Sequence, residues 1–199
     1  MQIPVTVDRR RQQLFELCST VLQQHPLIVA SNRGPLEYHL SPDGLLQPRR
    51  GSGAIVTALS SLIQNFEFTW VANALGEGDR RAQQEAESGA ILSPLPKQKV
   101  SARYVITPRR MYHKFYNIFC NPLLWFLQHS MWSSAYTPNI DSTVHDAWVT
   151  GYAPVNQAFA DAIVAEADGG PAPIVMVNDY HLYLVPSMVR KEIPSAIIQ

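Results

Sequence analysis

The sequence has little cysteine, no net charge and no long hydrophobic run. Sixteen lysine and arginine residues balance sixteen aspartate and glutamate residues, so the charge does not point to a nucleic-acid or anionic-membrane partner. No apolar run is long enough to span a membrane, and the N-terminal residues lack the apolar core of a signal peptide. The two cysteines, Cys18 and Cys120, lie in separate apolar helical patterns, which favours reduced core residues and a cytoplasmic location.

Two nucleotide-binding motifs are also missing. The sequence contains neither a Gly-Lys-Ser/Thr run of the Walker type nor a Gly-x-Gly-x-x-Gly fingerprint, which argues against a stand-alone nucleotide-binding protein. Hydrophobic residues make up 46% of the 199 residues and charged residues 16%, a composition typical of a globular protein. This length is sufficient for one compact domain with its own core.

Short apolar runs alternate with amphipathic stretches along the chain. Strands are expected at residues 26–31, 68–72, 100–107 and 173–177, with a hairpin over 36–48 and the start of another strand at 194–199. Helical patterns separate the strands, and Asp79 is expected to cap one helix that ends near residue 88. The alternation predicts an α/β fold with a doubly wound, mostly parallel sheet. We expect a helical extension over 1–25 and a domain over 26–199 that is incomplete at its C-terminal end.

Polar residues follow several of the apolar strands. Arg33, Asn73 and Asp179 each come directly after one, so we expect them along one edge of the sheet, where ligands bind in open α/β folds. A guanidinium can hold a phosphate bidentately, and a carboxylate can accept a hydrogen bond from a sugar hydroxyl. The pattern therefore suits a phosphorylated, hydroxyl-rich substrate. For Asp179, a simple helix-capping role is an equally good reading.

A glycine-rich helix start lies close to this expected edge. Gly51, Ser52 and Gly53 precede a helical pattern, and the free backbone amides of a helix start can bind a phosphate. A plain helix start is the alternative, because so short a Gly-x-Gly pattern is weak by itself.

The block at residues 111–119 is rich in aromatic side chains. Asn121 and Pro122 form a good helix start, and a break there would let Tyr116 and Trp125 face one pocket. Without the break, a nine-residue gap would place the two rings on opposite faces of a helix. From the pattern alone, filling the core is the preferred role for both rings.

Four segments follow one another along the chain: Ser31-Asn32-Arg33-Gly34-Pro35, Gly51-Ser52-Gly53, Tyr116-Asn117 with Asn121 and Leu124-Trp125, and Asn178-Asp179-Tyr180-His181-Leu182. In these segments and their order the sequence resembles trehalose-6-phosphate synthases, which are retaining glycosyltransferases of the two-lobed GT-B class. The resemblance covers about residues 26–199 and only the N-terminal, Rossmann-like lobe of that family. The third and fourth segments are the most specific.

The resemblance implies roles for particular residues. Arg33 would bind the phosphate of the acceptor, glucose 6-phosphate. Tyr116 and Trp125 would shape the acceptor pocket, and Asp179, the expected catalytic residue, would hydrogen-bond an acceptor hydroxyl. Gly51, Ser52 and Gly53 would approach the diphosphate of the donor, UDP-glucose or a related nucleotide sugar. Glucose would be transferred with retention, without a metal, another cofactor or a protein nucleophile.

Three departures from the family pattern bear on these implications. Asn73 stands where the family has the second tryptophan of a Trp-x-Gly-Trp segment, which leaves the acceptor open, and Asn178 replaces a histidine. The chain also stops before a His-bearing loop and the C-terminal lobe that grips the donor, so we expect these residues alone to bind acceptor without turnover. Alternatives are a relative with another acceptor, such as a glucosylglycerol-phosphate synthase or a pseudo-glycosyltransferase, and a non-catalytic sugar-phosphate-binding module. Homo-oligomers are compatible with all of these.

Overall fold

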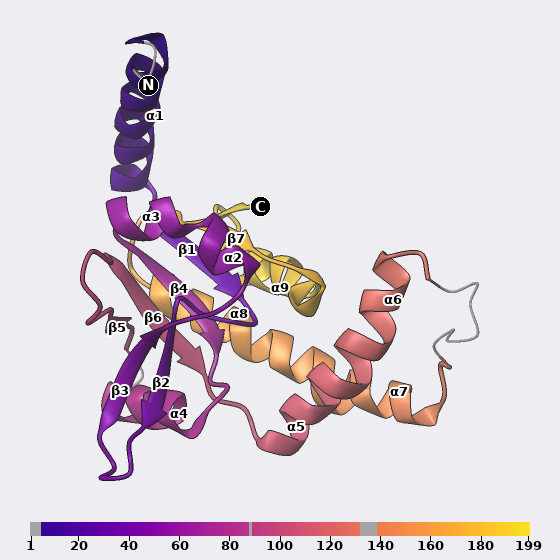
Figure 1. Ribbon diagram of the computed structural model, residues 1–199. Helices are drawn as coiled ribbons and strands as arrows, with labels where there is room; N and C mark the ends of the chain where they lie inside the picture. Colours follow the sequence, from indigo (N-terminus) through magenta and orange to yellow (C-terminus); the bar gives the residue numbers. More distant parts are fainter. Residues whose placement is uncertain (1–4, 88, 132–138) are drawn as a thin grey trace.

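The computed structural model describes residues 5–87, 89–131 and 139–199. A six-stranded sheet with the order β5-β6-β4-β1-β7-β8 forms its centre (Figure 1). The strands are β1 (Leu27–Ser31), β4 (Phe68–Asn73), β5 (Ile91–Leu92), β6 (Val100–Val105), β7 (Ile174–Val177) and β8 (Ile197–Ile198). All neighbouring strands pair in parallel except the short edge strand β5. The predicted α/β class with a mostly parallel sheet is confirmed.

Strand β1 lies in the middle of the sheet and is buried along its whole length. Val29 pairs with Trp70 of β4 on one side and with Met176 of β7 on the other. Both faces of β1 are covered, which explains why its sequence is a continuous apolar run rather than an alternating one. Because β1, β4 and β7 run in parallel, Ser31, Asn73 and Val177 end them at the same edge.

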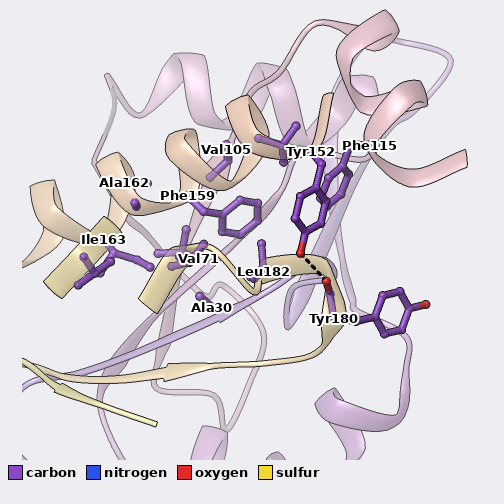
Figure 2. Packing of buried hydrophobic residues seen from close by; sticks show 14 of the residues in the cluster. Ala30, Val71, Val105, Phe115, Tyr152, Phe159, Ala162, Ile163, Tyr180 and Leu182 are labelled. Carbon is purple, nitrogen blue, oxygen red and sulfur yellow. Dashed lines mark hydrogen bonds between the residues drawn. The ribbon is translucent and has the colours of Figure 1, made fainter. Parts of the chain in front are cut away.

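Helices cover both faces of this sheet. Ile28 and Ala30 of β1 face a large core with α8 (Ala153–Ala167) and α9 (Val185–Glu192), and Figure 2 shows Phe159, Ala162 and Ile163 of α8 among its side chains. The alternate residues Leu27 and Val29 face a second core with α2 (Ala54–Ala58) and α3 (Ser60–Asn65). The two-residue alternation of a strand therefore divides β1 between two cores.

The predicted hairpin packs beside this sheet with α4 (Glu77–Glu85). It consists of β2 (Leu36–Leu40) and β3 (Leu46–Arg50), which pair antiparallel. The prediction that Asp79 is the cap residue of α4 was wrong, because the cap position is occupied by Gly76. Asp79 lies inside the first turn, where its Oδ2 accepts from Gly76 N at 2.9 Å and its Oδ1 accepts from Tyr38 N at 2.7 Å. Asp79 thereby joins α4 to the hairpin.

The expected helix break at Asn121–Pro122 was also wrong. The helix continues from α5 (Arg109–His113) through the π-helical segment η1 (Lys114–Leu124) into α6 (Trp125–Gln128), with Pro122 inside it. Proline cannot supply the hydrogen bond of a regular α-helical turn, and its ring clashes with the preceding turn. A wider π-helical stretch is one way for a helix to absorb such an interruption. Asn121 accepts a hydrogen bond from the Tyr180 hydroxyl instead of capping a helix.

The remaining helices extend from this body. Helix α1 (Val5–Gln24) stands out from the sheet, while α7 (Ser142–Ala147) and the π-helical η2 (Trp148–Tyr152) lead into α8 (Figure 1). Gly151 of η2 packs against η1, because a Cβ there would lie 2.7 Å from Lys114 Cβ. Cys18 and Cys120 are both free. Within the described ranges, no helix is both long and apolar enough to cross a membrane.

Candidate functional site

A pocket of about 490 Å³ opens at the carboxyl edge of the parallel sheet. Its walls come from the segments after β1 and β7, the start of α2, and the helix η1. The lining residues are Ser31, Asn32, Arg33, Gly53, Ala54, Ile55, Tyr116, Asn178, Asp179 and His181. The structure thus brings Arg33, Gly53, Tyr116 and Asp179 together from four separate segments of the chain.

Arg33 supplies a half-exposed cation to this pocket. Its side chain is 48% exposed, and Nη1 lies 3.9 Å from Glu37 Oε1, which is at the limit of an ion pair. The backbone beside it is fixed more firmly, since Ser31 Oγ donates to Arg33 O at 2.6 Å and accepts from Trp70 Nε1 at 2.8 Å. The guanidinium therefore remains available to an anion, while the strand end that carries it is held by the core.

Asp179 faces the pocket from a strained backbone. Its φ of 76° and ψ of 163° lie in a region that is essentially restricted to glycine and costs of order 1–3 kcal/mol for other residues. Oδ1 accepts from Tyr180 N at 2.8 Å, and Oδ2 lies 3.4 Å from His181 Nδ1. The His181 ring lowers the pKa of the Asp179 carboxyl, while partial burial opposes the shift. Asp179 does cap the short helix η3 (Tyr180–Leu182), and half of its side chain is still exposed.

Buried polar side chains at the end of η2 and on α8 hold the turn that follows Asp179. The Tyr152 hydroxyl donates to Tyr180 O at 2.8 Å (Figure 2) and accepts from Tyr183 N at 3.2 Å. Asn156, which is fully buried, donates to His181 O at 3.0 Å and accepts from Leu184 N at 3.1 Å. These four bonds keep the turn in place despite the strain at Asp179.

The three residues expected at the donor diphosphate differ in position. Gly53 lines the pocket and has a φ of 130°, which suits glycine. Ser52 is exposed outside the lining, and its hydroxyl donates to Glu37 Oε1 at 3.3 Å. Gly51 is buried, and a Cβ there would lie 2.0 Å from Gly34 O, so its role in the structure is close backbone packing. Because α2 has only five residues, free amides rather than a long helix dipole would contact an anion here.

The two aromatic residues expected at the acceptor are separated. Tyr116 lines the pocket, between near-parallel stacks on Tyr112 and His181. Trp125 is outside the lining; its ring lies against Phe126 and His129 and is 36% exposed. Since the helix does not break at Pro122, Trp125 lies nine residues further along the same helix and outside the pocket wall that Tyr116 forms.

Asn32 and His181 also line the pocket, although the sequence had assigned no binding or catalytic role to either. Asn32 Oδ1 accepts from Asn73 Nδ2 at 2.7 Å, so Asn73 lies behind the lining and not in it. Asn32 is next to Arg33 and His181 is two residues after Asp179, so the sequence motifs that contain them could have indicated both. For Asn73 Oδ1 and both His181 ring nitrogens, no hydrogen-bond partner lies in the described part of the chain. In the same part, no cluster of three or more His, Cys, Asp or Glu residues is placed to hold a metal ion.

The fold and the pocket define an α/β domain with a cation, free amides and a carboxylate around one cavity at the edge of its sheet. A family model described as glycosyltransferase family 20 matches residues 25–199. The chain therefore belongs to glycosyltransferase family 20, and the resemblance to trehalose-6-phosphate synthases is confirmed.

Similar proteins show the extent of this relationship. The chain is 33% identical over 172 residues to alpha,alpha-trehalose-phosphate synthase [UDP-forming] 2 of Aspergillus fumigatus, covering 86% of this chain and 33% of that protein. It thus spans about a third of the length of this relative. A Burkholderia xenovorans alpha,alpha-trehalose-phosphate synthase (UDP-forming), solved with glucose-6-phosphate, has a TM-score of 0.58 and 18% identity over 87% of this chain and 33% of that one.

A further solved structure with this fold comes from a protein with a different name. The N-terminal domain of Candida albicans trehalose-6-phosphate phosphatase has a TM-score of 0.57 and 19% identity, over 88% of this chain and 34% of that one. At such identities the two structural likenesses show the fold, and the function has to be argued from the pocket.

Proposed function

We propose that residues 26–199 form the acceptor-binding lobe of a retaining glycosyltransferase that transfers glucose from UDP-glucose to glucose 6-phosphate. The observation that carries this proposal is the placement of Arg33 and Asp179 in one pocket. A guanidinium and a carboxylate can together hold a molecule that bears a phosphate at one end and hydroxyls at the other. The names of two relatives, one UDP-forming and one solved with glucose-6-phosphate, support these substrates.

In this proposal each group has a defined task. Arg33 pairs with the phosphate of the acceptor, and Asp179 accepts a hydrogen bond from the hydroxyl to be glycosylated or from a neighbour of it. Tyr116 forms the wall between them, and its ring stacks on His181 with an interplanar angle of 11°. The role of Trp125 remains a prediction, because its ring lies outside the pocket lining.

The donor side is less complete in these residues. Gly53 and the amides at the start of α2 are the groups that could approach a diphosphate, and Gly51 and Ser52 support them from outside the lining. Arg33 is the one arginine or lysine among the described lining residues, and we assign it to the acceptor, so the described lining supplies no such cation to the donor. The two free cysteines suit the reducing cytoplasm as the place of action.

A sugar-phosphate-binding module without transferase activity is the second candidate. It is favoured by the presence of the same fold in a domain of a trehalose-6-phosphate phosphatase. Such a module would bind the sugar phosphate in the same pocket. It would differ from the enzyme in not binding the nucleotide-sugar donor. A transferase with an acceptor other than glucose 6-phosphate is the third candidate. Asn73 stands where the family pattern has a tryptophan, and it hydrogen-bonds the lining residue Asn32 from behind the pocket wall.

Calorimetric titration tests the acceptor assignment. We expect glucose 6-phosphate to bind the wild-type chain, glucose to bind more weakly, and Arg33→Ala to lose about 1.5–3 kcal/mol of binding free energy, the usual contribution of a charge-assisted hydrogen bond. Arg49→Ala, at an exposed arginine in β3 outside the lining, is the matched control and should leave the affinity unchanged. Glycerol 3-phosphate belongs in the same panel, since a preference for it would change the acceptor.

Equal affinity of wild type and Arg33→Ala for every sugar phosphate tested would contradict the role of Arg33.

A further inference from the structure

His181 is a buried side chain with unused hydrogen-bonding capacity in the wall of the pocket. Only 7% of the residue is exposed, both ring nitrogens are sealed from solvent, and neither has a hydrogen-bond partner among the described residues. Unpaired buried donors and acceptors are unfavourable. Their presence in a pocket wall therefore indicates an interaction with a neighbouring polar group.

The carboxylate of Asp179 lies close to this ring. His181 Nδ1 lies 3.4 Å from Asp179 Oδ2, slightly beyond the length of a good hydrogen bond. If the ring carries its proton on Nδ1, an N–H points toward a carboxylate oxygen. If the proton is on Nε2, a lone pair faces the carboxylate and the N–H is buried without a partner. Electrostatics therefore favours a proton on Nδ1.

The ring has little freedom to turn away from Asp179. It stacks on Tyr116 with ring centroids 5.7 Å apart and on Tyr180 with centroids 4.2 Å apart, at interplanar angles of 11° and 25°. Its own backbone carbonyl is held by Asn156. The imidazole is thus a fixed plane whose edge meets one oxygen of Asp179, while Tyr180 N occupies the other.

We propose that His181 is a positioning residue that donates from Nδ1 to Asp179 and thereby sets the direction in which the carboxylate meets the acceptor hydroxyl. The His181 ring also stacks on Tyr116, so it contacts both Tyr116 and Asp179, the two residues assigned to the sugar. This inference rests on the proposed function for its consequence in binding, but the state of the ring itself can be measured without any ligand.

Two substitutions separate the two ring nitrogens. The amide nitrogen of Asn can take the place of Nδ1, whereas that of Gln reaches the position of Nε2. We expect His181→Asn to bind glucose 6-phosphate within about threefold of wild type, and His181→Gln to lose about ten- to hundredfold, the range of a charge-assisted hydrogen bond. His145→Gln, at an exposed histidine of α7 outside the pocket lining, should leave the affinity unchanged. Thermal melting of each variant identifies any that is unfolded.

A double-mutant cycle distinguishes positioning from simple packing. If His181 acts through Asp179, the loss caused by His181→Gln should disappear in an Asp179→Asn background. A loss of the same size in both backgrounds, or equal affinity of the Asn and Gln variants, would overturn the proposal.

Nitrogen-15 NMR of the histidine rings tests the same claim in the ligand-free chain. We expect His181 to carry a proton on Nδ1 and its signals to shift in Asp179→Asn while those of the exposed His145 stay in place. An Nε2-protonated His181 would refute the inference whether or not a sugar phosphate binds. Failure of the wild-type chain to bind glucose 6-phosphate would instead count against the proposed function and leave the NMR result to decide on His181.

Discussion

At the residue scale, Asp179 is held in the pocket wall on a strained backbone. Its backbone occupies a region that is costly for any residue with a side chain, with a φ of 76°. The turn is nevertheless kept by hydrogen bonds from Tyr152 and Asn156. Buried polar contacts thus maintain a strained backbone in the wall of a ligand pocket. Such an arrangement fits a site in which the direction of the Asp179 carboxylate matters.

The pH dependence of stability should reveal this carboxylate. The folded protein lowers the pKa of Asp179, chiefly through the neighbouring His181 ring, so folding favours the ionised form. The resulting stabilisation is complete above the ordinary value near 4 and is lost as the pH falls through the lower folded value. We therefore expect Asp179→Asn to be less stable than wild type near pH 7, with a difference that shrinks below about pH 4. Urea unfolding at several pH values measures it, and a difference that widens on acidification would contradict the assignment.

At the element scale, α8 acts as the support of the site. Tyr152 and Asn156 lie one helical turn apart on α8 or at its start, and both reach the turn after β7. The other buried side chains of α8 pack on the sheet beneath (Figure 2). The helix that fills the core thereby also fixes the backbone from which Asp179 projects.

Removing one hydroxyl tests this support. Tyr152→Phe deletes the group that contacts Tyr180 O and Tyr183 N, and we expect it to lower the free energy of unfolding by about 1–3 kcal/mol, the cost of buried polar groups left unpaired. Sugar-phosphate affinity should fall as well, because the turn carrying Asp179 loosens. Tyr183→Phe is the control: its ring is exposed, and the change should stay within about 0.5 kcal/mol. Equal unfolding free energies for the two variants would show that α8 does not hold the turn.

The elements could be predicted from the sequence where the hydrophobic pattern was decisive. Strands β1, β4 and β7 are apolar runs followed by polar residues, and parallel pairing then places Arg33 and Asp179 at one edge. The continuous helix through Pro122 could not be predicted, because local preference favours a helix start there and only packing stabilises the wider turn. The prediction that Trp125 faces the pocket depended on a helix break at Pro122, so it could not be made correctly either. The unpaired state of His181 depends on contacts between segments distant in sequence, which no local pattern reports.

At the scale of the whole molecule, stability and ligand binding depend on different contacts. Arg103 of β6 and Glu166 of α8 form an ion pair at 2.6 Å, with side chains only 16% and 15% exposed. Neither residue lines the pocket. Thr69 of β4 also donates to Glu166, so this carboxylate joins α8 to two strands. Breaking this partly buried pair leaves a charge without its partner.

Glu166→Ala should therefore destabilise the fold without altering the pocket. We expect a loss of about 1.5–3 kcal/mol in the free energy of unfolding, the usual contribution of a hydrogen bond to a charged group, measured by urea denaturation. The folded fraction should bind sugar phosphate with unchanged affinity. Glu85→Ala breaks the exposed pair of Glu85 with Arg81 and should cost less than about 1 kcal/mol. If Glu166→Ala were as stable as wild type but failed to bind sugar phosphate, the assignment of Glu166 to stability rather than to binding would be wrong.

A crystal structure of the chain with glucose 6-phosphate tests the central claim most directly. The account predicts the phosphate against the Arg33 guanidinium, the sugar ring beside Tyr116, and a hydroxyl within hydrogen-bonding distance of the Asp179 carboxylate. A sugar phosphate ordered on any other surface, with this pocket filled only by solvent, would contradict it.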